Sequence, residues 1–234
     1  MSKILASIQP SYLPWLPYFE RIKQSDIFVF LDNVQFVKNS LQNRNYIINN
    51  NHLTRLTIPV VHKFGQNICD VKIDNSKNWR EKHWKSIFQS YSKSQYFDVI
   101  KDDLFKIYSK SWDNLSKFNI CIIKLLIDNL KIKTKVFVAS ELQVEKKDDS
   151  NLTLIEYCKF FKADTFIVKP NTDSYHPYSI FKKNKIKLET FNFGNDDILK
   201  LNKIQSYNRI DKKTYYLSFL DYFCKFGGLW RIFS

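Results

Sequence analysis

Short hydrophobic segments separated by polar turns dominate the first part of the chain. Residues 3–9 tend towards alternation and stop at Pro10, a pattern that predicts a strand ended by proline. Residues 26–31 form an almost continuous apolar run, which is typical of a strand buried on both faces of a parallel sheet. Residues 18–24 have the spacing of a short amphipathic helix. The chain therefore begins with a predicted β-loop-α-β unit.

A hairpin and a block of helices are predicted next. Two alternating segments, residues 43–49 and 53–61, flank an Asn-rich turn and predict a β-hairpin. A short strand is predicted over residues 68–73. Helical spacing follows, with a serine cap expected at Ser76. The predicted helices cover residues 76–91, 96–110 and 112–129.

Strands and helices alternate again after Lys131. Predicted strands cover residues 136–138, 165–168 and 185–191, and predicted helices cover 152–162 and 178–184. A loop over 192–211 and an aromatic helix over 213–226 close the chain. The β-α-β order predicts a parallel sheet with right-handed crossovers. The expected fold is α/β, with a mostly parallel Rossmann-like sheet. We expect a single domain over residues 1–234, with a hairpin and helices inserted at about 43–130.

The composition is that of a folded protein without a membrane span. Of the 234 residues, 44% are hydrophobic and 16% aromatic, which excludes disorder as the main state. No apolar run reaches the ~18 residues that a span needs, and the N-terminal segment reads as a strand rather than a signal peptide. The four cysteines form no CxxC or Cys/His cluster, so reduced thiols in the cytoplasm and no metal site are expected. Cys121 and Cys158 lie among apolar residues and are predicted to be buried and inert.

The formal charge of +14 favours anionic partners, such as phosphorylated small molecules, nucleic acid or an acidic membrane surface. The lysines are scattered, however, so the alternative is a solvated surface that reflects an A+T-rich genome. Walker, GxGxxG, GxSxG and HExxH signatures are missing from the sequence, and four glycines do not supply a glycine-rich phosphate loop.

Polar residues follow the first two predicted strands. Gln9 ends the first strand, and Asp32 and Gln35 follow the second, so neighbouring strands would bring all three to one edge of the sheet. Tyr12 and Trp15 would then be aromatic walls, a combination that suits a sugar or a nucleoside. The alternative is that the proline-rich aromatic loop is a packed turn.

Two further candidates come from the predicted insertion. Arg44 beside Asn43 has the donors to bind a phosphate or carboxylate, with Lys38 close enough in sequence to share the anion. The alternative is a hydrogen-bonded turn. His83, next to a tryptophan on a predicted helix, is either a general base or a structural histidine packed among aromatic side chains.

Several motifs together resemble the WbqC-like protein family. They are IQPSYLPW at 8–15, SDIFVFLDNVQF at 25–36, NRN at 43–45, LTIPV at 56–60, ICDVKID at 68–74, WREKHW at 79–84, SEL at 140–142 and ADTF at 163–166. The resemblance spans roughly residues 3 to 190. Two positions depart from the family pattern: Pro17 replaces a usual glycine and Asn33 a common second aspartate. Asp32 is therefore the better candidate for an essential carboxylate.

The resemblance implies a role in bacterial surface-polysaccharide or O-antigen biosynthesis. It implies an enzyme that acts on a nucleotide-activated sugar, with acyl or aminoacyl transfer to an amino sugar as a reaction, and carries over no established catalytic residues. The candidate catalytic residues are Asp32 and His83, and the candidate substrate-binding residues are Gln9, Tyr12, Trp15, Gln35, Lys38, Asn43 and Arg44.

Two other function classes remain open. A nucleic-acid-binding or DNA-modifying accessory protein would use the positive charge, and a non-catalytic scaffold would serve polysaccharide enzymes. The sequence identifies no cofactor, and it leaves the oligomeric state open.

Overall fold

The structure is a computed structural model that describes residues 2–49, 52–169 and 176–191, together with Leu220 and Cys224. The chain divides into two compact units, which are treated separately below. The sheet unit consists of Met1–Ile8, Pro17–Leu31 and Lys133–Asn195. The inserted unit consists of Gln9–Leu16, Asp32–Ile132 and Asp196–Ser234.

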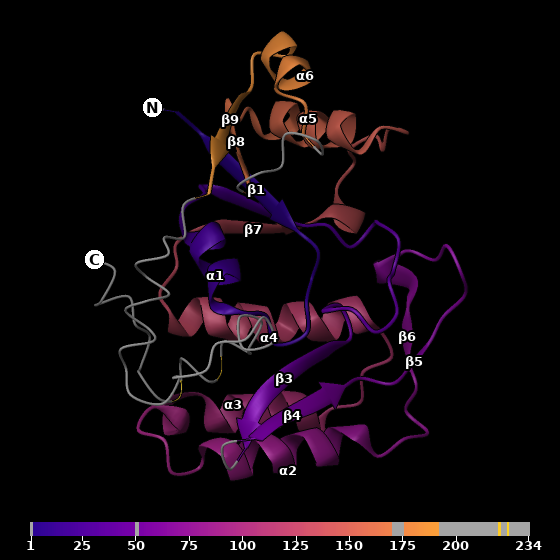
Figure 1. Ribbon diagram of the computed structural model, residues 1–234, viewed down its shortest axis with the longest axis vertical. Helices are drawn as coiled ribbons and strands as arrows, with labels where there is room; N and C mark the ends of the chain where they lie inside the picture. Colours follow the sequence, from indigo (N-terminus) through magenta and orange to yellow (C-terminus); the bar gives the residue numbers. More distant parts are fainter. Residues whose placement is uncertain (1, 50–51, 170–175, 192–219, 221–223, 225–234) are drawn as a thin grey trace. The chain divides into compact units, whose positions relative to one another are not determined.

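The sheet unit contains five parallel strands in the spatial order β7-β2-β1-β8-β9 (Figure 1). The strands are β1 (Ile4–Ile8), β2 (Ile27–Phe30), β7 (Lys135–Val138), β8 (Thr165–Val168) and β9 (Lys187–Thr190). Counted along the chain within this sheet, the order is 3-2-1-4-5, which is the order of the Rossmann fold. The prediction of a parallel, Rossmann-like α/β sheet is confirmed.

Apolar runs account for the central strands of this sheet. Leu5 in β1 pairs with Ile27 of β2 on one side and with Phe166 of β8 on the other. All four residues of β2, and all four of β8, are buried, as a sheet covered on both faces requires. Three helices belong to this part of the chain: α1 (Leu16–Lys23), α5 (Ser150–Phe161) and α6 (Tyr178–Lys183).

The core of the sheet unit joins strands to α5 and α6. Leu5, Val29 and Phe166 from the strands pack in one cluster with Ile155 of α5 and Phe181 of α6. Helix α5 starts where the Asp149 carboxylate accepts a hydrogen bond from the Asn151 backbone N–H at 2.8 Å. It ends at Lys162, whose φ of 54° is left-handed.

Between Asp32 and Ile132, the described part of the inserted unit contains a hairpin, a second small sheet and three α-helices. Strands β3 (Arg44–Asn49) and β4 (His52–Thr57) pair antiparallel, and β5 (Val60–Val61) pairs with β6 (Lys72–Ile73). The helices are α2 (Trp79–Tyr91), α3 (Phe97–Ser109) and α4 (Leu115–Asn129). The predicted hairpin and helical block are thus present, within a segment that runs from Asp32 to Ile132.

Several predicted boundaries in the inserted unit were wrong. The strand predicted over residues 53–61 is divided at Pro59, which has no N–H to donate, and its second part pairs with β6. The strand predicted over 68–73 begins instead as a 3₁₀ turn, Ile68–Asp70. Helix α2 starts three residues beyond Ser76, whose hydroxyl donates to Asp74 at 2.6 Å and caps no helix.

Other predictions fall partly or wholly outside the described residues. The loop predicted over 192–211 lies there, as does nearly all of the helix predicted over 213–226. The prediction that residues 1–234 form a single domain stays a prediction. Cys158 is buried, as predicted, whereas Cys121 is only half-buried. Within the described ranges, no helix has the length and apolar character needed to cross a membrane.

Candidate functional site

Asp32 is the first residue of the long inserted segment, and its side chain is only 2% exposed. The Ser116 hydroxyl donates to the Asp32 carboxylate at 3.1 Å, and the Cys69 backbone N–H donates to the Asp32 carbonyl at 2.8 Å. Ser116 lies in the first turn of α4, where the partial positive charge of the helix N-terminus favours a nearby carboxylate. The inserted unit therefore holds the Asp32 carboxylate in one defined position.

Gln9 is held by a second buried amide. The Gln42 Nε2 donates to the Gln9 Oε1 at 2.6 Å, while the Gln42 Oε1 accepts from the Val37 backbone N–H at 2.8 Å. Gln42 is buried. The contact with Gln42 therefore fixes the position of the Gln9 amide.

Asn119 lies between the pair of Asp32 and Ser116 and the pair of Gln9 and Gln42. It lies one turn beyond Ser116 on the same face of α4, and it is fully buried. Its Nδ2 donates to the Gln42 carbonyl at 2.7 Å and to the Pro10 carbonyl at 3.1 Å. Within the described residues its Oδ1 is buried with no hydrogen-bond partner. The residues Gln9, Asp32, Gln42, Ser116 and Asn119 form the acid–amide cluster.

Sequence reasoning missed Ser116 and Asn119. The available signal was a pair of polar residues three positions apart on the apolar face of a helix. Such pairs carry no information about their partners, which here lie 84 and 77 residues away in the chain.

The Asn43 and Arg44 side chains organise the loop that precedes β3. Asn43 is buried, accepts from the Asn39 backbone N–H at 3.0 Å and donates to the Ile58 carbonyl at 3.0 Å. The Arg44 guanidinium donates to the Asn39 Oδ1 at 2.6 Å and to the Thr57 hydroxyl at 3.2 Å. Asn39 has a φ of 63°, a left-handed conformation that asparagine tolerates.

Arg44 thus contacts Asn39, the residue that follows Lys38 in the chain, and Lys38 is exposed. It is also the bonding that a structural turn requires. The amide of Asn43 is occupied at both ends, so the geometry favours a loop-forming role for Asn43.

Tyr12 lies in the interior of the inserted unit rather than at an exposed rim. Its side chain is 0% exposed, and its hydroxyl lies 2.8 Å from the His83 Nδ1 and 2.6 Å from the Tyr108 hydroxyl. Trp15 is half-buried, and Gln35 is exposed and bridges to Asn67. Burial of Tyr12 favours the alternative of a packed aromatic turn at this position.

His83 lies on α2 and packs between the rings of Tyr12 and Trp79. The imidazole is stacked on Tyr12 at 5.6 Å and contacts Trp79 edge-on at 5.3 Å. Burial lowers the pKa of His83 from 6.5 to about 4, although a hydrogen bond with the Thr57 backbone opposes this change. At neutral pH the imidazole is uncharged and weakly basic, which favours the structural alternative for His83.

The Cys69 thiol is affected by the charge of Asp32 in the acid–amide cluster. Burial, with a smaller contribution from the negative charges of Asp32 and Asp70, raises the pKa of Cys69 to about 11. The thiol is protonated at neutral pH, so it lacks the thiolate that covalent catalysis would need. Among the described residues, no three His, Cys, Asp or Glu side chains group as metal ligands.

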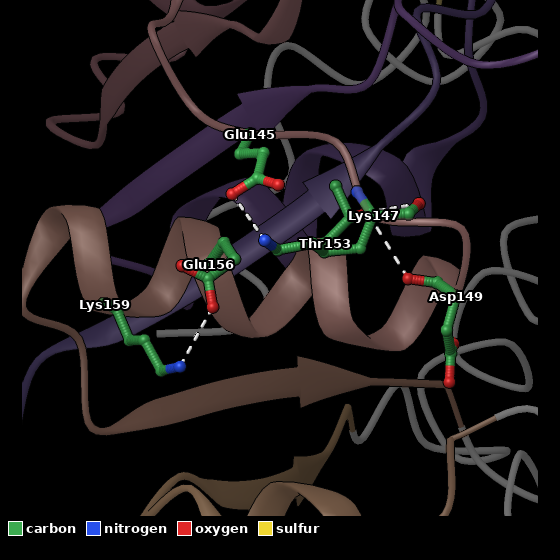
Figure 2. Close-up of polar contacts among 6 residues, drawn as sticks. All are labelled: Glu145, Lys147, Asp149, Thr153, Glu156 and Lys159. Carbon is green, nitrogen blue, oxygen red and sulfur yellow. Dashed lines mark hydrogen bonds and ion pairs between the residues drawn. The ribbon is translucent and has the colours of Figure 1, made fainter.

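Part of the positive charge is neutralised locally. Six lysines form ion pairs with acidic residues close to them in the chain, including Lys147 with Glu145 and Lys159 with Glu156 (Figure 2). Such exposed pairs contribute little stability, about 0–1 kcal/mol each. They leave fewer lysines for a continuous basic face.

The chain is similar to known proteins over most of its length. The model of the WbqC-like protein family matches residues 9–227. The uncharacterized protein Rv1507c of Mycobacterium tuberculosis (strain ATCC 25618 / H37Rv) is 30% identical over 194 residues, which cover 82% of this chain and 83% of the relative. This α/β protein, with its Rossmann strand order and its buried carboxylate, belongs to the WbqC-like protein family.

Proposed function

We propose that the protein is an enzyme of bacterial surface-polysaccharide biosynthesis that acts on a nucleotide-activated amino sugar. The reaction is the transfer of an acyl or aminoacyl group to the sugar amine. The chain's membership of the WbqC-like protein family supports the biosynthetic context, because resemblance to that family implies work on surface polysaccharides. The observation that carries the enzymatic proposal is the buried carboxylate of Asp32, bonded by Ser116 and set in a cluster of amides.

Asp32 is the general base in this reaction. It accepts a proton from the sugar amine as the amine nitrogen attacks the carbonyl carbon of an activated acyl donor. A carbon–nitrogen bond forms, the bond to the donor's leaving group breaks, and the leaving group departs with the electron pair. Gln9 donates a hydrogen bond to the sugar, and Arg44 and Lys38 offer cationic donors for an anionic group.

Binding of candidate substrates tests the proposal first. Thermal unfolding is followed with UDP- and dTDP-linked amino sugars, the free nucleotides, acyl-coenzyme A and a short DNA duplex at physiological salt. A ligand present at about 100 times its Kd stabilises the folded state by about 2.7 kcal/mol. A shift with one amino-sugar nucleotide that is lost in Q9A supports the proposal, while K117A, on the exposed side of α4, is the matched control.

Turnover then tests the role of Asp32. With the substrate pair in hand, D32N should lower kcat at least 100-fold while the far-UV circular dichroism spectrum stays that of the wild type. Equal kcat in D32N overturns the assignment of Asp32. A salt-sensitive shift with DNA alone points to the nucleic-acid alternative, and no shift with any ligand points to a scaffold.

A further inference from the structure

The sheet unit brings three basic side chains to one region. Arg21 projects from α1, and its Nη2 donates to the Ile167 carbonyl in β8 at 2.6 Å. Lys169 directly follows the last residue of β8. The ring of His176 contacts Phe166 of the same strand, with 6.3 Å between the ring centroids. Arg21 and His176 therefore contact β8 from two separate segments of the chain, and Lys169 follows the same strand.

Arg21 is the most enclosed of these groups, with 6% of its side chain exposed. Its Nε is buried without an acceptor among the described residues, and no ion pair with a carboxylate is formed within those ranges. Burial lowers the pKa of Arg21 to about 10, so the guanidinium still carries its charge at neutral pH. A buried cation without a carboxylate partner is costly, and an anionic ligand would compensate for it.

The positive charge of Arg21 acts on the other two groups. Burial is the larger cause of the lowered pKa of Lys169 and of His176, and the positive charge of Arg21 is the second cause for both. The charge of Arg21 therefore disfavours the protonated forms of both groups. Lys169 is exposed at the surface although its ammonium group is partly desolvated, so a ligand can reach it.

The orientation of His176 leaves one ring nitrogen for a ligand. Its Nδ1 lies 2.7 Å from the Asn151 Oδ1, an acceptor, so Nδ1 carries the proton and Nε2 is the other ring nitrogen. Asn151 lies in the first turn of α5. The acidic group close to it is Asp149, whose carboxylate caps this helix.

The location has a topological reason to bind ligands. The first strand of the sheet, β1, lies at its centre, with β2 on one side and β8 on the other. The direction of strand addition reverses between β1 and β8, and in open α/β sheets ligands bind beyond the carboxyl ends of the strands at this point. Lys169 follows the carboxyl end of β8 at this switch point.

We propose that Arg21, Lys169 and His176 form a binding site in the sheet unit for the phosphate or diphosphate group of a ligand. Arg21 offers a planar set of donors, Lys169 a point charge and His176 a hydrogen-bond donor once protonated. The site stands independently of the transferase reaction proposed above. It differs from the pair of Arg44 and Lys38, which belongs to the inserted unit.

Titration calorimetry with inorganic pyrophosphate, UDP and uridine tests the site. Pyrophosphate and UDP should bind and uridine should not. The K169M and R21Q variants should raise the Kd for pyrophosphate at least tenfold, whereas K182M, an exposed lysine of α6, should leave it unchanged. If R21Q does not fold, K169M and H176Q still decide the outcome. Wild-type affinity in both of these variants, or the loss of binding in R44M instead, overturns the proposal.

The source of the phosphate is distinguished in the same experiment. Tighter binding of UDP than of pyrophosphate assigns the site to a nucleotide, and equal affinities assign it to an inorganic anion. If K169M abolishes pyrophosphate binding and no amino-sugar nucleotide binds to the wild type, this site is supported and the proposed function is overturned.

Sulfate provides a second readout, because its charge does not change between pH 6 and pH 8. A bound anion favours the protonated forms of His176 and Lys169, so sulfate should bind several-fold more tightly at pH 6 than at pH 8. The H176Q variant should lose most of this difference. A sulfate affinity with the same pH dependence in wild type and H176Q contradicts the role of His176.

Discussion

Acidification should destabilise the protein through His83, and the structure sets the size of the effect. Burial holds the pKa of His83 at about 4 in the folded protein, against about 6.5 in the unfolded chain. The unfolded state therefore binds a proton more readily, and stability falls as the pH drops through 6.5 towards 4. The full difference corresponds to about 3 kcal/mol, of which about 2 kcal/mol is lost between pH 7 and pH 5.

The effect is measured by urea unfolding at pH 7 and pH 5, in the wild type and in H83Q. Glutamine is uncharged at both pH values, so H83Q should lose about 2 kcal/mol less on acidification than the wild type does. H83Q should also be less stable at pH 7, because it disturbs the hydrogen bond with Tyr12. The H52Q variant removes an exposed imidazole and keeps His83, and it should retain the wild-type difference.

Equal losses on acidification in the wild type and H83Q would refute the reasoning. Should H83Q fail to fold, the NMR titration of the His83 ring in the wild type decides the question. An apparent pKa near 6.5 would mean that the imidazole is not buried against Tyr12 and Trp79 as described.

Three further predictions concern stability and reactivity. N119A should lower the free energy of unfolding in urea by about 2–4 kcal/mol, because it leaves the Gln42 and Pro10 carbonyls without their donor. The control K117A should stay within about 0.5 kcal/mol of the wild type. An N119A variant as stable as the wild type would show that Asn119 does not connect the cluster. Burial raises the pKa of Cys158 to about 12, so a disulfide reagent at pH 8 should modify Cys158 only after unfolding. Peptide mapping identifies the labelled cysteine. Rapid labelling of Cys158 in the folded protein would contradict its burial. The sheet unit has no tryptophan, whereas the inserted unit contains Trp15, Trp79, Trp84 and Trp112. A single domain should therefore show the same urea midpoint by tryptophan fluorescence and by far-UV circular dichroism. Two separate midpoints would mean that the units unfold independently.

The arrangement of the candidate site could be foreseen only in part. Gln9 and Asp32 were recognisable because polar residues interrupt the chain directly after apolar strands. That Gln42 holds Gln9 and that Ser116 holds Asp32 was not recognisable, since hydrogen-bond partners 33 and 84 residues apart leave no local pattern. Tyr12 has the same aromatic side chain whether it lines a rim or fills a core, and only its contacts with His83 and Tyr108 distinguish the two.

The sequence by itself determined the elements of the sheet and their class. Continuous apolar runs such as 165–168 and the β-α-β order are properties of neighbouring residues, and they were sufficient to predict a parallel α/β sheet. The tertiary structure decided the strand order, the pairing of β5 with β6 and the contacts of Arg21 and His176 with β8. These features depend on which distant segments pack together, and burial then sets the charge state of each group. Local patterning therefore specifies the elements, whereas long-range packing specifies the sites.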